Sequence, residues 1–117
     1  MRYAARLVLL ALLSLSSAAA DSAPASEPRT VAVTARRYEF EPATIILKKG
    51  ETVKLVVTSE DVTHGLFLRP LHVDMDLPAG EARTVVVTPA ESGTYTAICH
   101  HFCGAGHGGM KLKVIVE

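Results

Sequence analysis

The sequence predicts an all-β domain, a Greek-key β-sandwich of seven or eight strands, and three observations support this fold class. The 117-residue chain is 49% hydrophobic and 21% charged, which suits one folded domain. After residue 30, short segments either alternate apolar and polar residues or contain runs of β-branched residues. Pro and Gly residues separate these segments, and none of them keeps a helical period for ten residues.

The charge balance and the cysteine content exclude two classes of protein. The chain has 12 basic and 12 acidic residues, so its formal net charge is zero. A general nucleic-acid-binding protein needs a basic surface, and we expect no nucleic-acid partner. Two cysteines cannot build the disulfide framework of a small secreted domain, although one bridge could form.

Residues 1–20 are typical of a secretory signal peptide. Arg2 and Arg6 precede an apolar run over residues 7–17, and three alanines follow at 18–20. An uncleaved membrane anchor is the alternative, but a spanning helix needs about 20 apolar residues. We therefore expect a mature chain of residues 21–117 that is exported, for example to the periplasm, has no membrane span and carries a formal charge of −2.

The mature chain divides into a linker and one domain. Residues 21–29 contain Pro24 and Pro28 among small and polar residues, which predicts a flexible linker. The domain then covers residues 30–117. Seven strands are predicted in it, at 30–35, 43–49, 52–59, 64–69, 82–89, 93–99 and 110–117. In the last of these, the even-numbered residues are all apolar, which predicts that they face the core.

Candidate metal ligands are concentrated in residues 99–110, which read CHHFCGAGHGGM. This segment holds both cysteines and three of the five histidines, and its four glycines predict a loop. Thiolate, imidazole and thioether donors suit copper. A mononuclear blue-copper site uses one thiolate, so Cys99 and Cys103 could instead bridge two copper ions, with His107 and Met110 as terminal ligands. His64 has the strand parity to point into the same end of the sandwich.

Two motifs resemble a known family. DVTH at residues 61–64 and CHHFCGAGHGGM at 99–110 match the D-V-x-H and C-x-x-x-C-G-x-x-H-x-x-M patterns of the cupredoxin-fold CuA domain, found in cytochrome c oxidase subunit 2 and in nitrous-oxide reductase. The resemblance covers residues 30–117. It implies a cupredoxin-like sandwich with a binuclear copper centre.

The resemblance also implies a role for each candidate ligand. Cys99 and Cys103 would bridge both coppers, and His64 and His107 would each bind one of them. Met110 would be the weak axial ligand of one ion, and the backbone carbonyl of His101 would bind the other. The chain departs from the oxidase pattern in having His101 where Glu is usual, and in having no Trp for a cytochrome c entry patch.

These ligands predict an electron carrier that is not itself an enzyme. They fill the coordination positions and leave none for a substrate, and a closed site suits transfer of single electrons. The expected partners are a cytochrome or another redox protein, as donor and as acceptor, for a monomeric chain.

Three alternatives stay open at this point. A copper chaperone or storage protein could bind Cu(I) through the same residues. Structural zinc could use two cysteines and two histidines, which would leave Met110 without a role. Cys99 and Cys103 could also form a simple disulfide. His72 and His100 have no motif support and are predicted to be exposed, whereas Asp61 is predicted to support a turn or a ligand.

Overall fold

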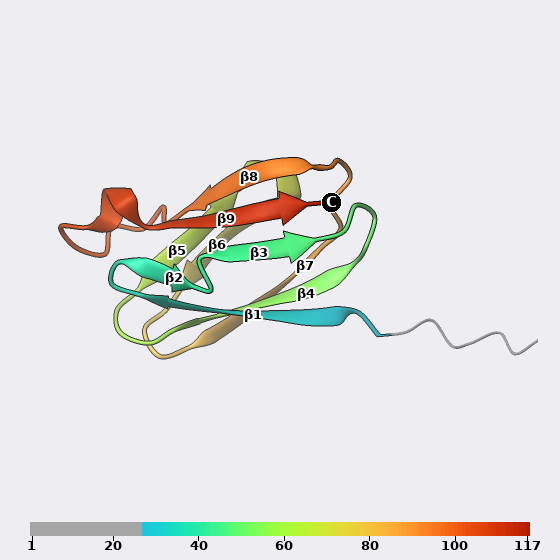
Figure 1. The fold of residues 1–117 in the computed structure, drawn as a ribbon. Coiled ribbons are helices and arrows are strands. Elements are labelled where there is room, and N and C mark those ends of the chain that lie inside the picture. The colour runs from blue at the N-terminus through green and yellow to red at the C-terminus, as the bar shows by residue number, and fades with distance from the viewer. Residues whose placement is uncertain (1–26) are drawn as a thin grey trace, which may run out of the picture.

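The computed structural model describes residues 27–117, which form two packed β-sheets (Figure 1). The predicted signal peptide, 1–20, and most of the predicted linker lie outside the described residues. The four-stranded sheet has the order β2 (Glu39–Glu41), β1 (Arg29–Arg36), β4 (Val53–Ser59), β7 (Ala82–Val87). The five-stranded sheet has the order β3 (Thr44–Leu47), β9 (Lys111–Val116), β8 (Gly93–Ile98), β5 (His64–Leu68), β6 (Val73–Leu77). The described helices are two 3₁₀ turns, η1 (Arg69–Leu71) and η2 (His107–Gly109).

The chain crosses repeatedly between the two sheets, which confirms the predicted Greek-key sandwich class. β3 joins the five-stranded sheet, β4 returns to the four-stranded sheet, and β5 crosses over again. Two of the strand pairs, β1 with β4 and β3 with β9, are parallel, and the other pairs are antiparallel. Strands that are distant in sequence therefore become neighbours, as β3 and β9 do.

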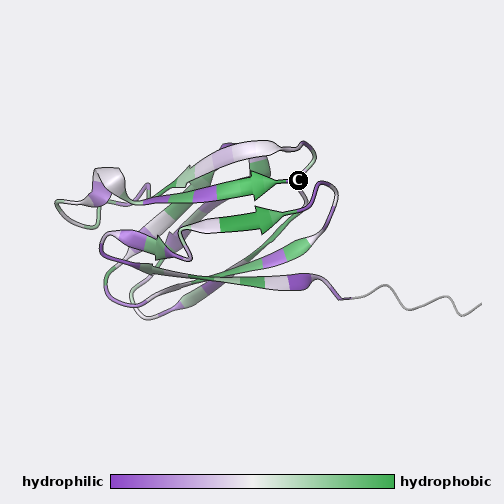
Figure 2. Ribbon diagram, in the orientation of Figure 1, coloured by the Kyte–Doolittle hydropathy of each residue, from purple (hydrophilic) through white to green (hydrophobic). Residues whose placement is uncertain are grey.

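Alternating apolar residues fill the space between the sheets. In β9, Leu112, Val114 and Val116 are buried, while Lys111 and Lys113 are exposed, as the sequence predicts. Figure 2 shows this alternation as hydrophobic (green) and hydrophilic (purple) bands along the strands. Each fully buried aliphatic side chain contributes roughly 1.5–3 kcal/mol. The domain therefore has a hydrophobic core that does not depend on a metal.

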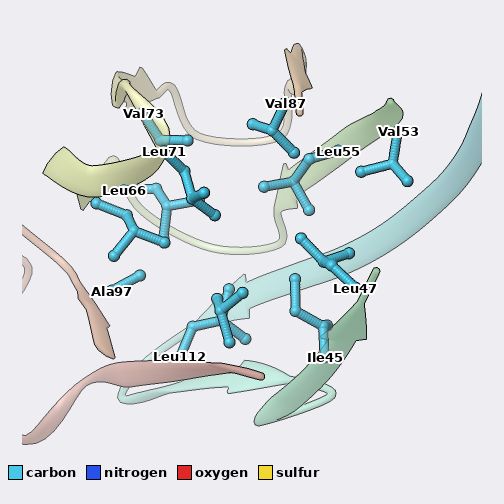
Figure 3. A pocket seen from close by; sticks show the side chains of 12 residues that line it. Ile45, Leu47, Val53, Leu55, Leu66, Leu71, Val73, Val87, Ala97 and Leu112 are labelled. Atoms are coloured by element: carbon cyan, nitrogen blue, oxygen red, sulfur yellow. The ribbon is translucent and has the colours of Figure 1, made fainter. Parts of the chain in front are cut away.

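The core leaves a small enclosed cavity, shown in Figure 3. Its volume is about 10 Å³, and all its lining residues are aliphatic, including Leu66, Val73 and Leu112. A cavity of this size without polar groups does not hold an ordered water. This cavity is therefore too small to be a ligand-binding site.

The structure corrects the number and the bounds of the strands. The described residues form nine strands, of which β2 and β6 were not predicted. β2 has only three residues, and Phe40 is the one that it buries. In β6, Asp74 and Asp76 face outward, and these strand-disfavouring residues mask the apolar alternation on the inner face. The other strands differ from the predictions by one or two residues at their ends, and β1 begins at Arg29.

One end of the sandwich carries the residues singled out by their chemistry. The loop over residues 99–110 joins β8 to β9 and projects beyond the sheets, and the turn between β1 and β2 lies at the same end (Figure 1). The C-terminus lies at the opposite end, where the Lys49 N–H donates to the Glu117 carbonyl. Among residues 27–117, no helix is long and apolar enough to cross a membrane.

Candidate metal centre

The loop over residues 99–110 begins where the antiparallel pairing of β8 with β9 ends. Ile98 pairs with Lys111 in the last register of this ladder. One further hydrogen bond, from the Cys99 N–H to the Met110 carbonyl (3.2 Å), closes the base of the loop. Cys99 and Met110 are both buried, so the first and last predicted ligands of the loop meet under it.

The two thiols lie side by side and are not bonded to each other. The Sγ atoms of Cys99 and Cys103 are 3.9 Å apart, against about 2.05 Å in a disulfide. The two residues are only 3% and 4% exposed. This pair is therefore a shielded double-thiol site at the end of the core.

A first set of donors surrounds Cys99. The Nδ1 atom of His64 lies 3.9 Å from the Cys99 Sγ, and the His101 carbonyl oxygen lies 3.2 Å from it. His64 is fully buried at the start of β5 and shares the inward face of that strand with Leu66. Together, His64, Cys99 and Cys103 have donor atoms within 4.8 Å of one another.

A second set surrounds Cys103. The Nδ1 atom of His107 lies 3.7 Å from the Cys103 Sγ, and the Met110 Sδ lies 3.8 Å from it. His107 stands at the start of η2, and Met110 ends that turn at 1% exposure. The structure thus brings together all six residues that the sequence singled out, with two further donors beside each of the two cysteine sulfurs.

Burial also affects the protonation of the thiol pair. Burial of the Cys103 thiol is the main cause that raises its pKa, and together with the neighbouring Cys99 it brings the pKa to about 11. In the metal-free protein at neutral pH, the Cys103 thiol therefore keeps its proton. A metal that binds this sulfur as thiolate must displace that proton, so its affinity rises with pH.

Asp61 orients the His64 ring. Its Oδ1 atom lies 2.6 Å from the His64 Nε2, so a proton on Nε2 leaves Nδ1 free to face Cys99. Asp61 also accepts hydrogen bonds from the backbone N–H groups of Arg37 (2.7 Å) and Val62 (2.6 Å). Burial acts to raise the pKa of Asp61, but these hydrogen bonds outweigh it and lower the pKa to about 2. Asp61 is therefore an ionised acceptor at neutral pH.

His100 is not one of the candidate ligands, but it packs against Gly65, which contacts Cys99. Its Nε2 atom lies 2.9 Å from Asp74 Oδ1, and its ring covers Gly65, where an added Cβ would clash with it. The Gly65 N–H in turn donates to the Cys99 Sγ at 3.5 Å. His72 is exposed, as predicted. Sequence reasoning missed the contact between Gly65 and His100, because only the fold brings these two residues together.

One exposed aromatic residue lies on the outer surface of the site. Phe102, between the two cysteines, is 73% exposed. It borders a shallow open hollow that is also lined by Arg37, Val62 and His101. Cys103 is itself one of the residues that line this hollow, so the hollow adjoins the candidate metal centre.

Comparison with known proteins agrees with this arrangement. The family model described as "Cupredoxin-like domain" matches residues 5–116. The chain belongs to the cupredoxin-like domain family. This cupredoxin-like domain is 32% identical over 88 residues to cytochrome c oxidase subunit 2 of Thermus thermophilus, covering 75% of this chain and 65% of that protein. It is 33% identical over 92 residues to nitrous-oxide reductase of Cupriavidus necator, covering 75% of this chain and 14% of that protein.

Solved structures confirm the cupredoxin-like fold. A subunit of a heme-copper terminal oxidase dimer superposes with a TM-score of 0.69 at 28% identity, covering 76% of this chain and 65% of that one. The periplasmic domain of subunit II of cytochrome oxidase from Bradyrhizobium japonicum gives a TM-score of 0.70 at 16% identity, covering 76% and 83%, which is a likeness of fold alone. The chain thus spans less than two thirds of the length of the first of these relatives.

The donors of this cupredoxin-like domain fit copper. Two thiol sulfurs, a thioether sulfur and two ring nitrogens converge at separations of 3.7–3.9 Å between neighbours. Soft sulfur with imidazole selects copper or zinc over hard cations. A tetrahedral zinc site would use four of these groups and leave Met110 as a buried thioether without a metal to bind.

Proposed function

We propose that this cupredoxin-like domain carries single electrons through a pair of copper ions of the CuA type, in the periplasm or another exported compartment. The observation that supports it is the division of the donors into two sets around a shared pair of sulfurs. His64 and the His101 carbonyl lie on the Cys99 side, and His107 and Met110 lie on the Cys103 side. A mononuclear site would need only one of these sets.

In this proposal Cys99 and Cys103 would hold both metals through their thiolates, and each remaining donor would hold one of them. When bound, the copper pair supplies a reversible one-electron couple. The chain's own part is to hold the donors still and to keep water out, because little rearrangement and a dry site favour fast electron transfer. The buried side chains of Cys99, Cys103 and Met110 keep water out. Asp61 helps to hold the donors still, because it fixes the His64 ring.

The partners in this proposal are redox proteins that donate and accept electrons at the exposed surface around Phe102. The homology to cytochrome c oxidase subunit 2 and to nitrous-oxide reductase supports a terminal oxidase or reductase as the acceptor. In this reading the domain is an accessory carrier, and the reduction of the final substrate takes place on another protein.

The test is to measure the copper content of the mature protein together with its visible and EPR spectra. We expect two coppers per chain and a delocalised mixed-valence signal. One copper bound as Cu(I), and released readily to a chelator, would instead favour a chaperone or storage protein. Preferential and tight binding of zinc would overturn the copper assignment.

The His101→Ala variant tests the most unusual ligand in the proposal. Alanine keeps the backbone carbonyl that lies near Cys99, so we expect copper loading close to that of the wild type. The His101 ring points elsewhere, with its Nδ1 atom 3.0 Å from the Phe102 carbonyl oxygen. Loss of copper with an unchanged circular dichroism spectrum would mean that the imidazole is the ligand, and the CuA assignment would be wrong.

A further inference from the structure

The turn between β1 and β2 contacts the metal-binding loop, although the two are more than sixty residues apart in sequence. Arg37 and Tyr38 form this turn. The Arg37 Nε atom donates a hydrogen bond to the Cys103 carbonyl at 2.9 Å. The Tyr38 ring lies against Gly104 and Gly106 of the loop.

The packing of Tyr38 explains two of the four loop glycines. A Cβ atom on Gly106 would lie 2.9 Å from the Tyr38 Cδ1 and closer still to other ring atoms. A Cβ on Gly104 would lie 3.0 Å from the Tyr38 Cε1. At Gly108, by contrast, an added Cβ would meet nothing within 4 Å. Gly106 has an ordinary negative φ, so its role is to leave room for the ring rather than to permit an unusual backbone.

The loop segment under Tyr38 depends on this contact because its backbone bonds are local. The His107 N–H donates to the Gly104 carbonyl, and the Gly109 N–H donates to the Gly106 carbonyl, both at 3.1 Å. Neither bond ties the segment to a sheet. A glycine-rich segment with only local bonds has many accessible conformations unless another element packs on it.

The same turn also contacts the other half of the site. The Arg37 N–H donates to Asp61 Oδ2 at 2.7 Å, and the other oxygen of that carboxylate holds the His64 ring. The Arg37 side chain meanwhile holds the Cys103 carbonyl. One residue therefore links the support of His64 to the backbone of Cys103.

We propose that Arg37 and Tyr38 are positioning residues that set the spacing between the two donor sets, the turn acting as a clamp on the Cys103–Gly106 segment. The effect on bound copper rests on the proposed function, whereas the effect on the metal-free loop does not. Restricting the loop before metal binding reduces the ordering cost of binding and the rearrangement between redox states.

The experiment compares Tyr38→Ala with Tyr38→Phe, and uses Tyr95→Ala as the matched control. Tyr38 is 41% exposed, so its loss leaves the core intact. Tyr95 lies in β8, near the end of the sandwich away from the loop, and its hydroxyl donates to the Glu91 carbonyl. In the metal-free proteins, we expect amide hydrogen exchange at residues 104–109 to be at least tenfold faster in Tyr38→Ala than in the wild type. Tyr38→Phe and Tyr95→Ala should exchange at the wild-type rate there.

In the copper-loaded proteins, we expect Tyr38→Ala to shift the visible spectrum and the reduction potential. Tyr38→Phe keeps the ring that covers the glycines and should match the wild type. A second pair of variants tests the contact from the loop side. Gly106→Ala forces the Tyr38 ring away and should reproduce the faster exchange, whereas Gly108→Ala adds the same methyl group in open space and should not.

The outcomes separate the two proposals. Wild-type exchange at residues 104–109 in both Tyr38→Ala and Gly106→Ala would overturn the positioning role. Equal acceleration in Tyr95→Ala would do the same, because the effect would then be global. If wild-type protein took up no copper, the proposed function would fail, and the exchange measurements on the metal-free protein would still decide the role of the turn.

Discussion

The Asp61→Ala substitution tests how far one carboxylate organises the metal centre. Asp61 accepts three hydrogen bonds, from the backbone N–H groups of Arg37 and Val62 and from the His64 Nε2, at 2.6–2.7 Å. The His64 ring is fully buried, so water cannot replace the carboxylate there, whereas it can reach the other two donors more easily.

The magnitude follows from these three contacts. A buried donor left without a partner costs about 1–3 kcal/mol, and each hydrogen bond to a charged group contributes about 1.5–3 kcal/mol when water does not replace it. Allowing for the one-third exposure of the Asp61 side chain, we expect a loss of about 3 kcal/mol in the free energy of unfolding. For a domain of this size, that corresponds to roughly 12–24 °C in Tm.

The assay is thermal and urea unfolding of the metal-free, reduced protein, followed by circular dichroism. The matched control is Glu60→Ala, which removes the neighbouring carboxylate. Glu60 pairs with Arg36 at 2.9 Å on the surface, and exposed ion pairs contribute about 0–1 kcal/mol. A loss within about 0.5 kcal/mol of that control would refute the reasoning, as would an unchanged His64 ring tautomer by nitrogen NMR in Asp61→Ala.

Three further predictions concern the thiols, the thioether and the support of the loop. Cys99→Ser and Cys103→Ser should each abolish the two-copper centre, because one sulfur cannot bridge the pair; two coppers per chain in either variant, by metal analysis and EPR, would contradict the bridging role. Met110→Leu should retain both coppers and shift the reduction potential measured by voltammetry, because a weak thioether ligand affects the potential of the metal more than its affinity. Loss of copper would instead show that the thioether is a main ligand. Gly65→Ala should destabilise the metal-free protein by about 1–3 kcal/mol in urea unfolding, because the new methyl group would meet the His100 ring and lie 3.1 Å from the backbone nitrogen of His101. Gly108→Ala adds its methyl group in open space and should change the stability by less than about 0.5 kcal/mol. Equal effects of the two substitutions would refute the steric argument.

Most of the fold was predictable from local sequence pattern. β9 illustrates this, because its alternation of apolar and charged residues fixes which face meets the core. β6 was missed because Asp74 and Asp76 are poor strand formers in isolation. That strand forms because it pairs along its whole length with β5, a contact that no local pattern encodes.

The candidate ligands were predictable for a similar reason. Five of them lie within twelve residues of one another, so their spacing is visible in the sequence, and His64 follows from its strand parity and its DVTH motif. Their support was only partly predictable. Asp61 was expected to support a turn or a ligand, and it holds the His64 ring.

Tertiary structure alone decided which residues hold the loop in place. The four loop glycines look alike in the sequence, yet only Gly104 has a positive φ among them, at 139°, and only Gly104 and Gly106 lie under the Tyr38 ring. No local pattern marks Arg37 and Tyr38 as important. Their contacts with the loop, such as the bond from Arg37 to the Cys103 carbonyl, form only when folding brings the β1–β2 turn to the end of the sandwich where β8 and β9 separate. Local sequence sets the chemistry of the donors, whereas the distances between them depend on packing between segments that are far apart in the chain.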